Sequence, residues 1–174
     1  MTPEEFFYQV FEFLPRQGPG CTGASKKAYS YLPPLPRNAK ILDIGCGSGT
    51  QTMDLAGLTS GMITAVDNHQ PFIDAITARA QKDGMAGRIS AVCASMDTLP
   101  FEPGQFDLIW SEGAIFIMGF VQGLRAWKPL FSNGIPHPAD CAPAGSAKAT
   151  PSKAAFSGCS APAAVIRSIF CGLN

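Results

Sequence analysis

The most distinctive feature of the sequence is an acidic residue followed by glycines at alternate positions: Asp43, Gly45, Gly47 and Gly49. An apolar run precedes them, and a helix-compatible segment follows at residues 51–58. Glycine is needed where the backbone takes a positive φ or where a ligand must approach the main chain closely. The N–H groups at the start of the following helix can receive an anionic or polar ligand. Residues 41–50 therefore predict a strand, a tight turn and a helix start that together cradle a nucleotide-type cofactor.

The segments that must position this turn alternate between strands and helices. Apolar runs predict strands at residues 40–44, 62–66, 89–93 and 106–110. Helical spacing predicts helices at residues 51–58, 72–83 and 120–131, with Phe120, Leu124 and Trp127 facing the core. Such alternation implies an α/β fold, a parallel sheet with right-handed crossovers. Ligands in such sheets bind outside the carboxyl ends of the strands.

Two further segments precede the first strand. Residues 3–14 have the spacing of an amphipathic helix, which Pro15 ends. Residues 16–20 form a glycine-rich turn that carries one cation, Arg16. A second helix is expected at residues 22–32, with Thr22 as its candidate cap.

Polar side chains follow each of the other three predicted strands. They are Asp67 and Asn68 after the second strand, Ser95, Met96 and Asp97 after the third, and Ser111 and Glu112 after the fourth. Asp67 lies twenty positions beyond Gly47, where an acidic side chain can accept hydrogen bonds from both hydroxyls of a ribose. Purely structural interpretations stay open for several of these residues. Asp67 could cap a helix, Ser95 and Asp97 could cap a turn, Glu112 could be a solvated loop carboxylate, and Arg16 could form a surface salt bridge.

The glycine spacing separates two classes of cofactor. Dinucleotide fingerprints run G-x-G-x-x-G, but Thr50 stands where their third glycine would be. The pattern resembles motif I of the class I methyltransferases that use S-adenosylmethionine. The resemblance continues through residues 65–68, 95–101 and 106–113, where Leu-Pro-Phe and then Phe-Asp-Leu-Ile are typical of the type 11 subgroup. It covers residues 4–131 and implies a Rossmann-like parallel sheet with flanking helices.

The resemblance also implies roles for individual residues. Gly45, Cys46 and Gly47, with Gly49 in the same turn, would approach the methionine part and the ribose of the cofactor. Asp43 would face the methionine ammonium, Asp67 the ribose hydroxyls, and Asn68 the adenine. An acidic residue usually contacts the adenine amine where Ser95 aligns, which leaves Ser95, Met96 or Asp97 to hold the base. Ser111 and Glu112 would border the sulfonium and the methyl acceptor, and Arg16 lies in a segment that some of these enzymes place near the cofactor.

Composition sets outer bounds on the protein. The chain has 174 residues, of which 46% are hydrophobic, enough for one domain and its core. Its 13 basic and 13 acidic residues suggest no nucleic-acid partner, and no apolar run has the length of a membrane span. The N-terminus lacks a signal-peptide pattern, and the six cysteines show no C-x-x-C spacing. Cys46 and Cys93 are expected to be reduced core residues, His69 a surface residue, and the compartment the cytoplasm.

The last part of the chain departs from the family pattern. From residue 132 to 174, Ala, Ser, Pro and Gly supply 25 of 43 residues, which is typical of low-complexity coil until residues 163–170. We therefore expect a methyltransferase domain at residues 1–131 and a truncated, frame-shifted or otherwise aberrant tail at 132–174. Strands five to seven would be missing, and strand four would be an exposed edge open to homodimerisation unless the tail supplies a substitute. Zinc binding by His137, Cys141, Cys159 and Cys171 is not favoured, because their spacing matches no common ligand pattern.

Three functions remain open from the sequence. The leading hypothesis is an S-adenosylmethionine-dependent methyltransferase acting on a small molecule by in-line displacement. Such chemistry can rest on positioning and electrostatics, so no catalytic residue is assigned and no metal is expected. The alternatives are a cofactor-binding remnant without turnover and, further behind, a nicotinamide oxidoreductase.

Overall fold

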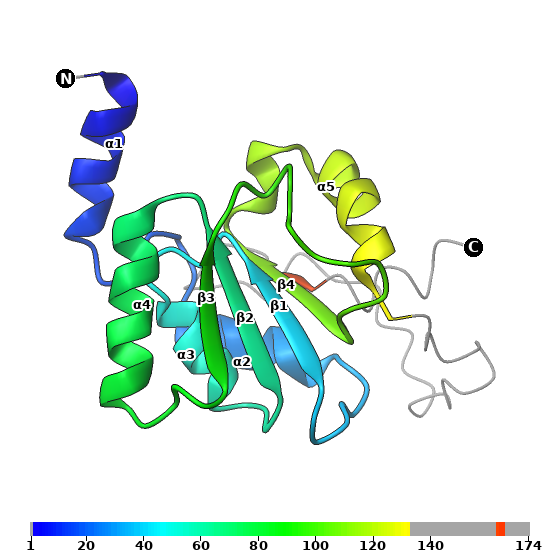
Figure 1. The fold of residues 1–174 in the computed structure, drawn as a ribbon. Coiled ribbons are helices and arrows are strands. Elements are labelled where there is room, and N and C mark those ends of the chain that lie inside the picture. Colours follow the sequence, from blue (N-terminus) through cyan, green and yellow to red (C-terminus); the bar gives the residue numbers. More distant parts are fainter. Residues whose placement is uncertain (1, 133–162, 166–174) are drawn as a thin grey trace.

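The computed structural model describes residues 2–132 and 163–165 (Figure 1). Four parallel strands form the centre of the sheet: β1 (Lys40–Ile44), β2 (Met62–Asp67), β3 (Ile89–Cys93) and β4 (Leu108–Glu112). The spatial order of the strands is β3-β2-β1-β4-β5. The chain adds β2 and β3 on one side of β1 and then crosses over to add β4 on the other side, which makes β1 and β4 the switch point of the sheet. This confirms the α/β, Rossmann-like prediction. A crevice for a ligand forms in such sheets at the carboxyl ends near this switch point.

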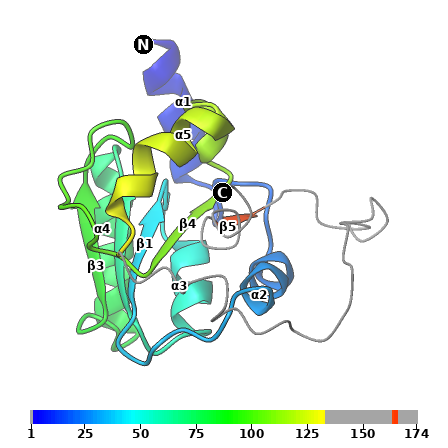
Figure 2. The same cartoon turned by 90° about the vertical axis from the view of Figure 1, so that its right-hand side faces the viewer.

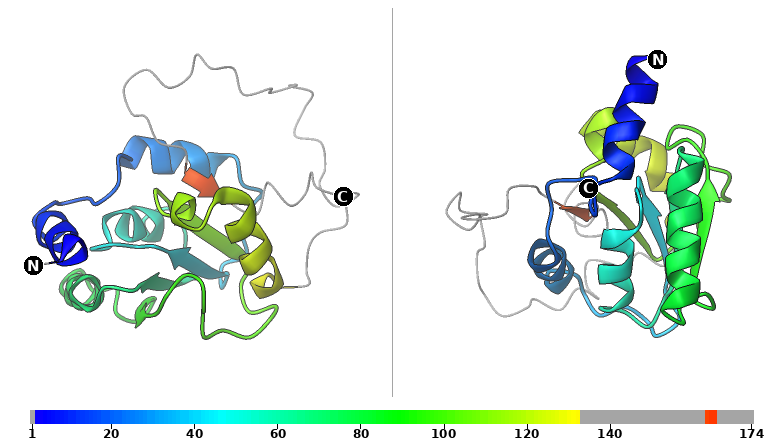
Figure 3. Two further views of the ribbon diagram at one scale, coloured as in Figure 1. Left: turned by 90° about the horizontal axis from the view of Figure 1, so that it is seen from above. Right: turned by 90° about the vertical axis from the view of Figure 1, so that its left-hand side faces the viewer.

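Helices cover both faces of the sheet (Figure 2). The first face carries α2 (Thr22–Ser30), α3 (Thr50–Ala56) and α4 (Gln70–Lys82), and the second carries α5 (Phe120–Trp127). Short 3-10 turns, η1 (Ile115–Ile117) and η2 (Lys128–Leu130), flank α5. A further helix, α1 (Pro3–Glu12), lies beside the start of α4 and far from α5 when the molecule is seen from above (Figure 3).

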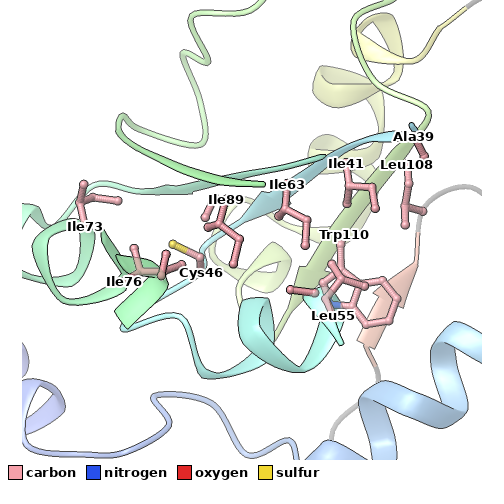
Figure 4. Packing of buried hydrophobic residues seen from close by; sticks show 13 residues of the cluster. Ala39, Ile41, Cys46, Leu55, Ile63, Ile73, Ile76, Ile89, Leu108 and Trp110 are labelled. Atoms are coloured by element: carbon pink, nitrogen blue, oxygen red, sulfur yellow. The ribbon is translucent and has the colours of Figure 1, made fainter. Parts of the chain in front are cut away.

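Two apolar clusters lie on the two faces of the sheet. The first runs from Ile73 and Ile76 of α4 to Trp110 of β4 (Figure 4). The second packs Leu124 and Trp127 of α5 against the opposite side. β1 has four consecutive buried residues from Ile41 to Ile44, because a central parallel strand is covered on both faces.

The predicted bounds hold for two strands and shift for most other elements. The second strand extends one residue further than predicted, to Asp67. The fourth strand begins at Leu108, not at 106, because the Asp107 carboxylate accepts the Lys40 N–H at 2.8 Å in place of a backbone partner. Ser111 and Glu112 thus lie inside the strand, and Phe106 forms an isolated parallel bridge with Phe131. Most of the predicted helices end earlier than expected, and residues 128–130 form a 3-10 turn.

Several residue environments also differ from the predictions. Thr22 is not the cap of α2, because Cys21 occupies that position and the Thr22 hydroxyl donates to Asp54 at 3.0 Å. Cys46 is buried as predicted, but Cys93 is exposed, since β3 is the edge strand of the sheet. Phe120 was predicted to face the core with Leu124 and Trp127, yet it is 45% exposed at the first turn of α5.

The edge of β4 has a partner in the described chain. A three-residue strand, β5 (Ala163–Val165), pairs antiparallel with Trp110, Ser111 and Glu112. The tail thus supplies a short substitute strand along β4, a possibility that the sequence left open. The other tail residues, including His137, Cys141, Cys159 and Cys171, lie outside the described residues. The division into two segments at residue 131 stays a prediction.

Candidate functional site

The glycine turn has the backbone that its sequence predicts. Gly45, Gly47 and Gly49 have φ values of 74°, 52° and 85°, a region that side-chain-bearing residues rarely adopt. A Cβ at Gly45 would collide with the Ala114 methyl, and one at Gly49 would lie 2.5 Å from Ile76 Cδ1. A Cβ at Gly47 would lie 2.6 Å from Gln17 Oε1. Each glycine is therefore favoured by its positive φ, and Gly45 is also required by the close Ala114, whereas the Gln17 side chain near Gly47 is flexible.

The N–H groups of this turn all have acceptors within the chain. Gly45 and Cys46 donate to the Val66 carbonyl at 2.8 and 3.0 Å, and Gly49 donates to the Cys46 carbonyl at 3.0 Å. Gly47 donates to Asp67 Oδ2 at 2.9 Å. Ser48 donates to Gln17 Oε1, also at 2.9 Å. From Gly45 to Gly49 the turn thus uses its donors internally, which distinguishes it from a loop that holds phosphate with several free N–H groups.

Asp43 lies beneath the turn as a buried acid. Its carboxylate is fully buried on the α3 side of the sheet, where Oδ2 accepts the Thr52 hydroxyl at 2.6 Å. The pKa of Asp43 is raised to about 7, chiefly by burial; the hydrogen bond from Thr52 acts to lower it, and the nearby carboxylates of Glu112 and Asp67 act to raise it. Oδ1 has no hydrogen-bond partner. Burial, with Asp43 and Asp67 nearby, also raises the pKa of the Cys46 thiol.

Glu112 and Arg16 form a buried ion pair at the end of β4. Arg16 Nη1 donates to Glu112 Oε1 at 3.0 Å and Nη2 to Asp54 Oδ2 at 2.5 Å. Ser25 of α2 donates to Glu112 Oε2 at 2.7 Å. The interpretation of Glu112 as a solvated loop carboxylate is wrong, since its side chain is only 3% exposed. Arg16 forms the salt bridge that the structural interpretation expected, but the pair is largely buried and not at the surface, since the Arg16 side chain is 13% exposed.

At the end of β2, Asp67 organises the turn into α4. Its Oδ1 accepts the His69 N–H at 3.1 Å while Oδ2 accepts from Gly47, so one carboxylate joins two strand ends. Asn68 Oδ1 accepts the Tyr8 hydroxyl at 3.1 Å. His69 stacks on the Tyr8 ring with centroids 3.9 Å apart and pairs with Glu12 at 2.6 Å. His69, predicted to be a surface residue, is only partly exposed, because Tyr8 and Glu12 of α1 cover its side chain to 17% exposure.

The end of β3 is the most open part of the site. Ser95 and Asp97 contact each other at 3.4 Å, and Asp97 is exposed. The carbonyl of Met96 accepts the Trp127 indole N–H at 2.9 Å, which ties this turn to α5. Ser111 is buried within β4, with its hydroxyl donating to the Ile44 carbonyl at 2.9 Å.

The structure places the predicted residues along the carboxyl edge of β3, β2, β1 and β4. Sequence reasoning missed five residues that hold them there: Tyr8, Gln17, Ser25, Thr52 and Asp54. Their partners lie 9 to 87 positions away in the chain, so no local spacing signals them. Of these five, only Gln17 had a signal in the sequence, because it adjoins Arg16 in the glycine-rich turn.

The chain matches a known protein family. The family described as "Methyltransferase domain" matches residues 41–129, just over half of the chain. The chain belongs to this family. The match spans the glycine turn, the Asp67 turn and the end of β4, which are the parts that the site brings together.

Individual relatives agree with this assignment. Sterol 24-C-methyltransferase erg-4 of Neurospora crassa is 30% identical over 77 residues, which cover 44% of this chain and 20% of that protein. Among solved structures, a putative sarcosine dimethylglycine methyltransferase from Galdieria sulphuraria superposes with a TM-score of 0.65 at 18% identity, covering 75% of this chain and 56% of that one. Geranyl diphosphate C-methyltransferase from Streptomyces coelicolor A3(2), solved with Mg²⁺, geranyl diphosphate and S-adenosyl-L-homocysteine, gives 0.60 at 14% identity, covering 64% and 42%.

The chain spans less than a third of the length of the curated relatives that it matches. Within residues 2–132 and 163–165, no helix is long and apolar enough to cross a bilayer. The same residues contain no cluster of three or more His, Cys, Asp or Glu side chains placed to hold a metal ion.

Proposed function

We propose that this methyltransferase domain binds S-adenosylmethionine and transfers its methyl group to a small molecule. The observation that carries the proposal is the charge of the site. Four carboxyl groups, those of Asp43, Asp54, Asp67 and Glu112, lie around the ends of β1, β2 and β4. Arg16 pairs with Asp54 and Glu112, and Asp43, with a pKa of about 7, is ionised in part at neutral pH. The buried Oδ1 of Asp43 has no partner. Such a site attracts a ligand that carries positive charge, as a sulfonium and an ammonium do.

The residues present fit this cofactor at both of its ends. Asp67 is the candidate for the ribose hydroxyls, because each of its oxygens makes one hydrogen bond and retains acceptor capacity. Asn68, Ser95, Met96 and Asp97 are the candidates for the adenine. The turn formed by Gly45, Cys46, Gly47 and Gly49 would lie against the ribose and methionine parts. Glu112 and the ionised fraction of Asp43 would supply the negative field beside the sulfonium, Ser111 would border it, and Arg16 would hold Glu112 in place.

The proposed methyl transfer requires no side chain that takes part in bond making or bond breaking. When bound, S-adenosylmethionine supplies a methyl group activated by the positive charge of its sulfonium. The chain contributes alignment of the reacting groups, which can lower such barriers by ~7–11 kcal/mol, and a pre-arranged field. We therefore assign no general base.

We further propose that the methyl acceptor is apolar. The segment after β4 exposes four large apolar side chains, Phe116 and Ile117 of η1 and Phe120 and Val121 at the start of α5. They begin four positions after Glu112, the residue that we place beside the acceptor. Relatives named for sterols support an acceptor of this kind. The balanced charge of the chain favours no nucleic acid, and we propose a cytoplasmic location. We do not propose a homodimer through the β4 edge, because β5 pairs with that edge.

Isothermal titration calorimetry of the full chain tests the proposal. We expect binding of S-adenosylmethionine and S-adenosylhomocysteine, and none of NAD, whose pyrophosphate would meet carboxylates and occupied N–H groups. Binding of NAD alone, or of none of the three, would contradict the proposal. Incubation with methyl-labelled cofactor and a cell extract, split into organic and aqueous fractions, should then place the label in the organic fraction. Label confined to the aqueous fraction would contradict the apolar acceptor.

A binding module without turnover is the second candidate. It is favoured by the sheet beyond β4, which the described residues continue only with the three-residue β5. Tight cofactor binding without label transfer to any fraction would support this candidate over the enzyme.

A further inference from the structure

Gln17 makes an unusual set of contacts for a side chain outside the family match. Its Oε1 accepts from both the backbone N–H and the hydroxyl of Ser48, each at 2.9 Å. Its Nε2 donates to the carbonyls of Phe11 and Leu14 at 3.0 and 2.8 Å. One carboxamide thus joins the glycine turn to the carboxyl end of α1, where helix carbonyls lack intrahelical donors.

The Ser48 N–H differs from the other donors of the turn. Those of Gly45, Cys46, Gly47 and Gly49 go to acceptors in the turn itself or at the end of β2. Only Ser48 donates to a segment that precedes the sheet. The same Gln17 side chain covers the Cα of Gly47, whereas Gly45 and Gly49 abut Ala114 and Ile76 of the compact fold.

The segment around Gln17 crosses the site. We call residues 15–20 the strap. The Thr50 hydroxyl donates to the Pro15 carbonyl, Arg16 pairs with Glu112 and Asp54, and Gly18 lies against the backbone of Glu112. The strap therefore meets the ends of β1 and β4.

Helix α1 meets the other end of the site. Tyr8 donates to Asn68 and stacks on His69, and Glu12 pairs with His69. Asn68 and His69 lie between β2 and α4, beside the proposed adenine position. Gln17 is the side chain that ties this helix to the glycine turn.

We propose that Gln17 is a positioning residue for the cofactor. By joining Ser48 to the end of α1, it holds α1 over the β2 turn and the strap over the glycine turn, so that both ends of the bound cofactor stay covered. This inference rests on the proposed function. It makes the retention of the cofactor, rather than the folding of the sheet, depend on one carboxamide.

The test measures cofactor affinity and local opening in the full chain. Gln17→Ala removes all four hydrogen bonds, and we expect the Kd for S-adenosylmethionine to rise about tenfold, mostly through faster dissociation. Hydrogen exchange should accelerate together in α1 and in the glycine turn. The thermal midpoint without cofactor should stay close to that of the wild type, because the sheet and its two clusters do not contain Gln17.

Two further variants separate the contacts. Gln17→Glu keeps an acceptor for Ser48 but loses the donor to Phe11 and Leu14, so it should open α1 while the turn stays protected. Ser48→Ala removes one of the four hydrogen bonds and should raise the Kd only slightly. Gln81→Ala, an exposed glutamine on α4, is the matched control and should change nothing.

The outcomes distinguish a failure of the proposed function from a failure of the positioning role of Gln17. If the wild type does not bind S-adenosylmethionine, the proposed function fails. If the wild type binds and Gln17→Ala binds equally well, the positioning role is overturned while the function stands. Tighter binding by Gln17→Ala would also overturn it, since Gln17 would then block the site. Should Gln17→Ala fail to fold, Gln17→Glu carries the same test, and acceleration at α1 without any loss of affinity would overturn the proposal.

Discussion

The two halves of the site place similar residues in opposite environments. At the ends of β1 and β4, Asp43 and Glu112 are buried and Arg16 is nearly so. At the end of β2, Asp67 is partly buried and Asn68 is exposed, and beyond β3 Asp97 is exposed. The first half presents concentrated charge away from water, and the second presents solvated hydrogen-bonding groups.

This difference follows from the positions of the strands. β1 is paired on both sides, and α2, α3 and the strap cover its carboxyl end together with that of β4. β3 is the edge strand, so its following turn meets solvent. Charge acts over a longer range in the buried half because water screens it less. We infer that the buried half controls stability and response to pH, and that the open half controls recognition of the ribose and adenine.

The largest expected effect is the dependence of stability on pH through Asp43. Its folded pKa of about 7 lies above the ordinary pKa of a free aspartate side chain, 3.8. Between these values the folded chain keeps a proton that the unfolded chain has lost, so stability is full below about pH 4 and falls as pH rises to 7. The loss amounts to about 4 kcal/mol at most. Urea unfolding at pH 5 and pH 7.5 should show about 2.5 kcal/mol of this loss, because part of it has already occurred at pH 5.

Asp43→Asn isolates this contribution. The neutral amide has no proton to release in this range, so the difference in unfolding free energy between the two pH values should nearly vanish. Asp97→Asn, in the open half, should keep the wild-type difference. An equal pH dependence in the wild type and in Asp43→Asn would show that the buried half does not control the response.

Removal of the cation from the buried half should come next in size. Arg16→Ala leaves Glu112 buried with Ser25 as its hydrogen-bond donor, and we expect a loss of about 3 kcal/mol in unfolding free energy. Arg125→Ala, at an exposed position of α5, is the matched control and should cost less than about 0.5 kcal/mol. Equal costs for the two variants would mean that the strap does not depend on this ion pair.

Loss of the Asp67 carboxylate should affect binding more than stability. Asp67→Asn weakens the acceptor for the ribose, and we expect the Kd for S-adenosylmethionine to rise about tenfold, equivalent to about 1.4 kcal/mol. Asp97→Ala should change the Kd less than about twofold. Calorimetry of both variants provides the measurement. The reverse order of effects would place the ribose nearer to β3 than to β2.

The smallest effect is expected at the surface contact of α1. Glu12 is 39% exposed, so its pair with His69 is screened by water. Glu12→Gln should reduce the unfolding free energy by less than about 0.5 kcal/mol, measured by urea unfolding at pH 7. A loss above about 1 kcal/mol would show that α1 contributes to the fold as well as to the site.

Local patterns in the sequence predicted the parts of the site that depend on neighbouring residues. The strands at 40–44 and 89–93 were predicted with their bounds, and the turn between Asp43 and Thr50 with its three left-handed glycines. Helix ends were less accurate, since the last residues of a helix make few intrahelical hydrogen bonds and helical spacing alone does not locate them. Burial was the weakest point, as Cys93, Phe120 and Glu112 show.

By itself, the sequence determined which strand ends carry the polar groups of the site and in what order they follow along the chain. An apolar strand, three alternate glycines and an acidic residue twenty positions later specify an α/β fold with polar groups at its carboxyl edge, because φ angles and strand periodicity are local properties. The environment of those groups came only from the tertiary structure. Ser25 lies 87 positions from Glu112, and Gln17 lies 31 positions from Ser48. Desolvation depends on such distant neighbours, so only the folded chain shows that Asp43 is a buried acid and that Gln17 joins α1 to the glycine turn.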